Sequence, residues 1–204
     1  MNWLAHIFLS PDDAEYRIGN VVADWVKGEA RLQLSAGIQR GIACHKVIDI
    51  YTDAHPITKQ SIARIEAPFK RYAGVLIDVF YDHILAQDWS HYCDVPLPAW
   101  TQQVYAQFRE HVDDLHPDLR MGLLRMANDD WLCSYATVEG IDAILKRMSR
   151  RLSRANLLGD ATPQLTAHLA GIRDDFHVFF PQLQAHVREW QAIETQPPKA
   201  LGAL

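Results

Sequence analysis

Residues 74–86 read GVLIDVFYDHILA, and this segment constrains the fold more than any other part of the chain. Drawn as a helix, it is apolar on every side apart from Asp78, Asp82, His83 and the amphipathic Tyr81. A helix that is hydrophobic all round lies in the interior of a protein. An ionised carboxylate there is costly unless it is paired, hydrogen-bonded or bound to a metal ion. We therefore expect a buried helix whose acids have partners elsewhere in the fold.

Helical periodicity also dominates the rest of the chain. We find no sustained period-two alternation and no Asn-Gly or Asp-Gly turn between β-branched runs. Helices are expected at about 2–9, 16–27, 35–52, 56–66, 68–89, 97–115, 117–128, 138–158 and 162–192. A length of 204 residues fits one domain better than two. The sequence thus predicts an all-α, single-domain helical bundle over residues 1–194, followed by a frayed tail, 195–204, that has no amphipathic face.

Glycine and proline mark the expected ends of several helices. Gly28 should end the second helix, and Pro56 and Pro68 should each begin one, because the first helical turn tolerates a missing N–H. Pro181 falls inside the last long helix and should kink it or divide it in two.

Three other apolar segments carry a polar pair at the i, i+4 spacing of the carboxylates in the buried helix. These pairs are Asn2 with His6, Asn20 with Asp24, and His45 with Asp49. Residues four apart share one face of a helix, so we expect the four faces to converge on a common polar centre. Carboxylate oxygens with a few imidazoles suit Mn²⁺ or Mg²⁺, and also Fe or Zn²⁺.

Such a centre supports phosphoester hydrolysis. A divalent ion lowers the pKa of a bound water and neutralises charge on phosphoryl oxygens, while a neighbouring acid or imidazole handles protons. The sequence contains no glycine-rich phosphate loop, serine nucleophile elbow or cysteine-based motif that would favour another chemistry.

Each of these residues also has a purely structural interpretation. His6 alone could be a packing histidine, Asp24 could be solvated, and Asp49 could pair with a nearby cation. Asn2 and Asn20 are expected to support or cap rather than to ligate. The doublet Asp82-His83 is the hardest to explain structurally, because a buried acid beside an imidazole needs a partner.

Charge and hydropathy exclude several classes of protein. The net charge of −5 argues against broad affinity for nucleic acid. The longest apolar runs are cut by carboxylates, so no membrane span is expected, and the N-terminus lacks the cationic region of a secretory signal. We therefore expect a cytoplasmic protein. Cys44, Cys93 and Cys133 are odd in number and far apart, which fits ordinary buried thiols.

Several segments resemble the acyl carrier protein phosphodiesterase family, also called acyl carrier protein hydrolase, a divergent relative of the HD-domain phosphohydrolases. They are MNWLAHIFLS, IGNVVADWVKG, GIACHKVIDIYTD and VLIDVFYDHILAQDWS, with DDWLCSY and FFPQL further along, and together they span nearly the whole chain. The resemblance implies an HD-like helical fold. It also implies Mn²⁺-assisted hydrolysis of holo acyl carrier protein to apo acyl carrier protein and 4′-phosphopantetheine, with Mg²⁺ or Fe as alternative metals.

The resemblance also implies roles for individual residues. Carried over position by position, the metal-site candidates are Asp24, His45, Asp82 and His83, and the catalytic candidates, which are weaker ligands, are His6, Asp49 and Asp78. The doublet here runs Asp then His, the reverse of the usual HD order, so the ligand assignments of ordinary HD enzymes do not transfer directly. The sequence therefore does not decide which of these residues bind the metal ion and which transfer protons.

A basic run, KRMSRRLSR, offers a surface for an acidic carrier protein. Its cations are Lys146, Arg147, Arg150, Arg151 and Arg154, and on a helix the four arginines would share one side. The alternative is a solvated face near a helix C-terminus, where cations are favoured by the helix dipole.

Two other functions remain open at the level of sequence. The chain could be an HD-like phosphohydrolase of a nucleotide or another small phosphoester. It could also be a non-catalytic helical binding module whose buried acids form a structural network.

Overall fold

The computed structural model describes residues 1–194, and the predicted frayed tail, 195–204, lies outside the described residues. Within that range all regular secondary structure is helical, so the prediction of an all-α fold is confirmed. The α-helices are α1 (Trp3–Phe8), α2 (Ala14–Val22), α3 (Ala36–Ala54), α4 (Pro56–Arg64), α5 (Ala73–Gln87), α6 (Leu97–His111), α7 (Pro117–Asn128), α8 (Val138–Ser149) and α9 (Thr162–Glu194). Short 3₁₀ helices are η1 (Gly28–Gln33), η2 (Lys70–Tyr72), η3 (Trp89–His91), η4 (Cys133–Ala136) and η5 (Leu158–Asp160). None of the described helices is long and apolar enough to cross a membrane.

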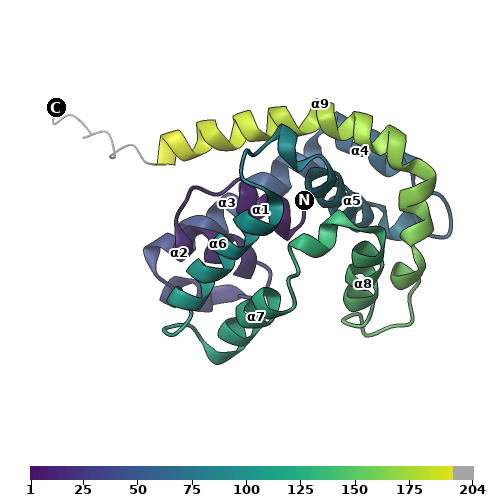
Figure 1. Ribbon diagram of the computed structural model, residues 1–204. Helices are drawn as coiled ribbons and strands as arrows, with labels where there is room; N and C mark the ends of the chain where they lie inside the picture. Colours follow the sequence, from purple (N-terminus) through teal and green to yellow (C-terminus); the bar gives the residue numbers. More distant parts are fainter. Residues whose placement is uncertain (195–204) are drawn as a thin grey trace, which may run out of the picture.

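Helix α5 is the buried helix expected from the sequence. Residues 79–86 are all buried, and the helix contacts α1, α4, α8 and α9. Figure 1 shows α5 in the interior, with the N-terminus of the chain beside it and α9 passing over the outside of the bundle. Both carboxylates of α5 have partners in other elements, as expected, with Asp82 fully buried and Asp78 partly buried.

Helices α2 and α3 approach each other at backbone distance, because glycines face each other between them. A Cβ on Gly19 would lie 2.1 Å from the carbonyl oxygen of Ile38, and a Cβ on Gly41 would lie 2.1 Å from that of Tyr16. Only glycine permits such an approach. The close packing brings the polar pair at the end of α2 beside the polar pair of α3.

The expectation that the second helix extends to Gly28 is wrong, because α2 ends at Val22. The carbonyls of the following turn are satisfied by a side chain: Arg31 donates from Nε to the carbonyl of Val26 at 2.8 Å and from Nη2 to that of Ala23 at 3.1 Å. Asp24 is therefore on a turn, and Gly28, with φ of 60°, begins η1.

The expected helix at 138–158 is also too long, because α8 ends at Ser149. Asn156 turns the chain back by donating from its amide to the carbonyl of Ser149 at 3.1 Å and accepting from the Ser149 hydroxyl at 2.8 Å. Arg150, Arg151 and Arg154 consequently follow the helix and do not form a stripe along it.

The prolines behave in three different ways. Pro56 occupies the first turn of α4, as predicted. Pro68 does not begin a helix, since α5 starts only at Ala73 after η2. Pro181 does not divide α9, which runs without a break and curves around the bundle (Figure 1).

The glycine contact between α2 and α3 yields a stability prediction. The Gly41→Ala variant should lose roughly 1–3 kcal/mol of unfolding free energy, because the added methyl group forces two backbones apart. Gly74→Ala is the matched control: a Cβ there meets nothing within 4 Å on an exposed helical position, so it should be neutral or stabilising. Urea denaturation of both variants checks this, and equal midpoints would contradict the close-packing argument.

Candidate metal centre

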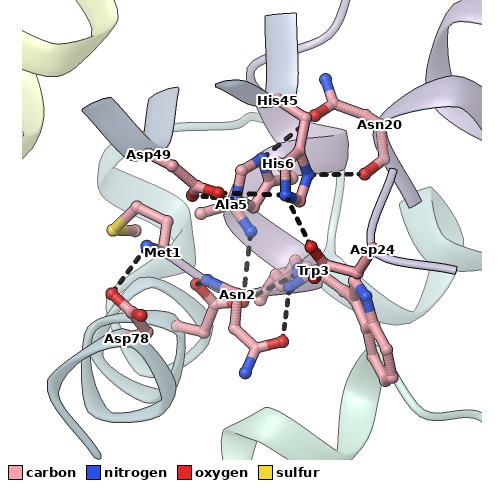
Figure 2. Close-up of polar contacts among 12 residues, drawn as sticks. Met1, Asn2, Trp3, Ala5, His6, Asn20, Asp24, His45, Asp49 and Asp78 are labelled. Carbon is pink, nitrogen blue, oxygen red and sulfur yellow. Dashed lines mark hydrogen bonds and ion pairs between the residues drawn. The ribbon is translucent and has the colours of Figure 1, made fainter. Parts of the chain in front are cut away.

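His6 from α1 and His45 and Asp49 from α3 meet at one point, and their ligand atoms all lie within 4.8 Å of one another. Asp49 lies between the two rings: its Oδ1 is 3.1 Å from His6 Nε2 and its Oδ2 is 3.0 Å from His45 Nε2. Asp24 approaches from the turn after α2, with Oδ1 3.4 Å from His45 Nε2. Figure 2 shows these side chains pointing toward one another.

The two imidazoles are held parallel by one residue, Asn20 of α2. The rings of His6 and His45 stack with centroids 4.1 Å apart. His45 Nδ1 lies 2.8 Å from the backbone carbonyl oxygen of Asn20, and His6 Nδ1 lies 3.0 Å from its side-chain Oδ1 (Figure 2). A carbonyl oxygen only accepts, so His45 Nδ1 carries the proton.

Ser10 fixes the orientation of the Asn20 amide. Asn20 Nδ2 donates to Ser10 Oγ at 2.8 Å, and that hydroxyl donates to the carbonyl of His6 at 3.0 Å. The amide oxygen therefore faces His6, and His6 Nδ1 also carries its proton. Both rings are thus set in the tautomer whose Nε2 lone pair faces the carboxylates.

This arrangement leaves acceptors facing acceptors. With both rings neutral, two Nε2 lone pairs face the oxygens of Asp49, and the buried His6 Nε2 makes no hydrogen bond despite its short distance to the acid. Such a geometry is stable only with a cation or extra protons among these atoms. Metal-binding histidines commonly donate their other ring N–H to a carbonyl or carboxylate, as both rings do here. The residues therefore fit a divalent metal ion.

The ring protonation differs between the two histidines in the absence of metal. Burial lowers the pKa of His6 to about 4. Burial also acts to lower the pKa of His45, but its contacts with Asp24 and Asp49 outweigh it and raise that pKa to about 9. The pKa of Asp49 falls well below its ordinary value, since the two histidines overcome the effect of burial.

Asp82 does not join this cluster. Its side chain is fully buried at the N-terminus of α1, where Oδ1 accepts from the Asn2 N–H at 3.0 Å and Oδ2 accepts from those of Leu4 at 2.8 Å and Ala5 at 3.3 Å. Burial raises the pKa of Asp82 to about 7, against the opposing effect of the N-terminal ammonium and these N–H groups. A metal ion would have to compete with three backbone donors for its oxygens.

His83 and Asp78 also have other partners. His83 Nδ1 donates to the carbonyl of Tyr135 at 2.7 Å, away from the cluster, and its buried Nε2 has no hydrogen bond. Asp78 accepts from the N-terminal ammonium of Met1 at 2.7 Å (Figure 2). It lines the same cavity as Asp24, His45 and Asp49, so it lies within reach of the centre without belonging to it.

The cavity in front of the centre has a volume of about 380 Å³. Its lining includes Arg147 and Arg151, which the sequence predicted to lie on an outer docking surface. The residues that line it are Met1, Asn2, Trp3, Asp24, Trp25, His45, Asp49, Asp53, Val75, Asp78, Ile144, Arg147, Met148 and Arg151. No periodicity in the sequence indicated that the end of α8 faces the centre.

A second group of potential ligands has a simpler explanation. Asp88, His91 and His177 lie close together, but Asp88 is already bound to Arg173 at 2.7 Å and to His177 at 2.9 Å. Asp88 is the only carboxylate of this group, and Arg173 neutralises it. The group is therefore an ion-pair network that joins the end of α5 to α9.

Comparison with known proteins decides the family. The model of the acyl carrier protein phosphodiesterase family matches residues 1–183. The chain belongs to this family. Relatives named acyl carrier protein phosphodiesterase occur in Photorhabdus laumondii, 30% identical over 187 residues that cover 90% of this chain and 93% of the relative, and in Escherichia coli K12, 30% identical over 190 residues that cover 91% and 96%. No solved structure shows significant similarity to the chain.

Membership of the acyl carrier protein phosphodiesterase family makes the chain an enzyme, a phosphoric diester hydrolase. The match includes every residue of the cluster and of the cavity wall, because all of them lie before residue 183.

The opposite pKa shifts of the two histidines predict how the stability of the metal-free protein depends on pH. His45 has a folded pKa near 9 against an ordinary 6.5, so its contribution is complete below about pH 6.5 and is lost as the pH rises through about 9. His6 has a folded pKa near 4, so stability falls as the pH drops from about 6.5 through 4, where the unfolded chain binds the extra proton. Asp82, with a folded pKa of about 7 against an ordinary 3.8, offsets the His6 effect between about pH 4 and 7, so the alkaline decline due to His45 should be the main feature of the profile.

Urea denaturation in the presence of a chelator measures this profile. His45→Asn should flatten the alkaline side, whereas His91→Asn, which changes an exposed histidine outside the centre, should leave the profile unchanged. An alkaline slope that survives the loss of His45 would show that the carboxylates do not hold its proton.

Proposed function

We propose that this enzyme hydrolyses the phosphodiester that joins 4′-phosphopantetheine to a serine of holo acyl carrier protein, releasing apo acyl carrier protein and 4′-phosphopantetheine. The reaction uses a divalent metal ion, with Mn²⁺ the first choice and Mg²⁺ or Fe the alternatives. One observation carries the metal dependence: in a chain of this family, the Nε2 atoms of two buried histidines lie within about 3 Å of one carboxylate, while Asn20 accepts from both Nδ1 atoms.

His6, His45 and Asp49 would hold the metal ion, with Asp24 as a fourth donor. Asp24 suits this role because it is on a turn and its side chain is 69% exposed, so it can move by the small distance that coordination requires. Asp82 is assigned to positioning, since it holds the start of α1 and thereby His6. His83 lies outside this proposed set.

When bound, the metal ion would act as a Lewis acid and lower the pKa of a water molecule to near neutrality. The protein's own residues have the remaining tasks. Asn20 keeps both rings oriented, and Asp78, which lines the same cavity, would transfer protons. Burial raises the pKa of Asp78, so more of this carboxyl is protonated near neutral pH and can donate to a leaving serine oxygen.

A groove beside the cavity gives room for a long prosthetic arm. It has a volume of about 690 Å³, shares Trp25 and Arg151 with the cavity, and continues along α7. Its apolar lining includes Leu119, Met121 and Leu124. A pantetheine chain that leaves the metal centre would find a mostly apolar path of this kind.

The carrier protein itself would meet the cations beyond the cavity. Arg150 and Arg154 are exposed, and Lys146 is exposed and paired with Asp142 at 2.7 Å. Together they present positive charge near the mouth of the site, where an acidic partner would be steered. Arg147 and Arg151 were expected to share this role; both line the cavity.

Metal analysis tests the proposed ligands. The Asp49→Asn variant should stay folded and lose Mn²⁺ affinity by at least about tenfold, because the amide supplies one neutral donor in place of a bridging acid. Asp53→Asn is the control, since Asp53 lines the cavity outside the cluster. Mn²⁺ titration of the chelated proteins gives both affinities, and equal affinities for the two variants would remove Asp49 from the ligand set.

Intact mass spectrometry tests the reaction. Holo acyl carrier protein incubated with the enzyme and Mn²⁺ should lose the mass of its 4′-phosphopantetheine group, and a chelator should prevent the loss. An unchanged carrier protein together with hydrolysis of nucleotides would favour a small-molecule phosphohydrolase. Absence of bound metal and of any metal-dependent hydrolysis would favour a non-catalytic module.

A further inference from the structure

Two guanidinium groups on the cavity wall have no anionic partner. Neither Arg147 nor Arg151 forms an ion pair with any carboxylate among residues 1–194, although four acids line the same cavity. Nη2 of Arg147 is buried and makes no hydrogen bond. A buried, unpaired donor of this kind is costly unless a ligand satisfies it.

Aromatic stacking holds Arg147 in a fixed orientation. Its guanidinium lies 3.9 Å from the ring centroid of Trp131, which is itself stacked on Trp3 at 5.3 Å. Arg151 lies 6.0 Å from the ring of Trp3 on the cavity side. Stacking leaves the in-plane N–H groups of a guanidinium free to bind oxygen atoms, so a stacked arginine can still donate hydrogen bonds to an anion.

We propose that Arg147 and Arg151 bind the non-bridging oxygens of the substrate's phosphate group, opposite the metal ligands. This inference rests on the proposed function, because it supplies the charge recognition that a phosphodiester needs at that site. Arginine suits the role, since its planar fork matches the oxygens of a phosphate. Burial also lowers the pKa of Arg147, so a bound anion would relieve the cost of its charge.

Phosphate binding by Arg147 and Arg151 has different consequences from docking of the carrier protein by the same residues. A docking arginine would affect only the carrier protein, whereas a phosphate-binding arginine affects every phosphate ligand of the site, including inorganic phosphate. The neighbouring Arg150 follows α8 directly but does not line the cavity, so it provides a control of the same residue type in the same segment.

Inorganic phosphate is the probe, and the fluorescence of the nearby Trp131, Trp3 and Trp25 is the signal. In the Mn²⁺-loaded protein, Arg147→Met and Arg151→Met should each weaken phosphate binding on the order of tenfold, while Arg150→Met should not. Arg147→Lys keeps the charge without the fork, so it should retain more affinity than Arg147→Met. Mn²⁺ affinity should be unchanged in all four variants.

The outcomes are distinguishable. Equal phosphate affinity in the wild type and in Arg147→Met, or no phosphate binding by the wild type, would overturn the assignment. Loss of turnover with holo carrier protein alone, with phosphate binding intact, would also overturn it and return the arginines to docking. Failure of the proposed function shows separately, as absence of hydrolysis by the wild type, because the phosphate titration does not depend on turnover.

Discussion

The centre depends on a carboxylate that does not take part in it. Asp82 lies fully buried on α5 and accepts hydrogen bonds from three backbone N–H groups at the start of α1. A six-residue helix has too few internal hydrogen bonds to be stable alone, so its position is set by this external contact. Since α1 carries His6, the buried acid determines where one of the two imidazoles stands.

The second imidazole is set by the contact between α2 and α3. Gly19 and Gly41 allow the two backbones to touch, which brings Asn20 within hydrogen-bond distance of both rings. One asparagine then fixes the tautomer of His6 and of His45. The two histidine rings, whose Nε2 atoms would bind a metal ion, are therefore held in a fixed orientation by the protein itself. Ligand atoms that are oriented in advance lose little entropy on binding.

Most of the fold follows from local sequence, and the site follows only in part. Periodicity identified the helices and the buried character of α5. The shared i, i+4 faces include His6, His45 and Asp49, which do meet, but the family resemblance ranks His6 and Asp49 below Asp82 and His83 as ligands. Periodicity could not separate an acid that caps another helix, such as Asp82, from an acid that faces a cavity, because both are buried polar residues on apolar helices. That distinction depends on which backbone N–H groups lie opposite, and those come from distant parts of the chain.

The end of α8 is a second place where local sequence does not show which part of the fold a side chain faces. A run of arginines on a long helix would form an outward stripe, but the side chain of Asn156 ends the helix at Ser149 and turns the chain back. Arg147 and Arg151 then reach the cavity instead of following one outer face. The acids of the cavity, which come from the turn after α2, from α3 and from α5, thus share it with cations from the end of α8 and the turn that follows. A metal ion held by the acids and a phosphate anion held by the arginines would each balance charges that the protein alone leaves unpaired.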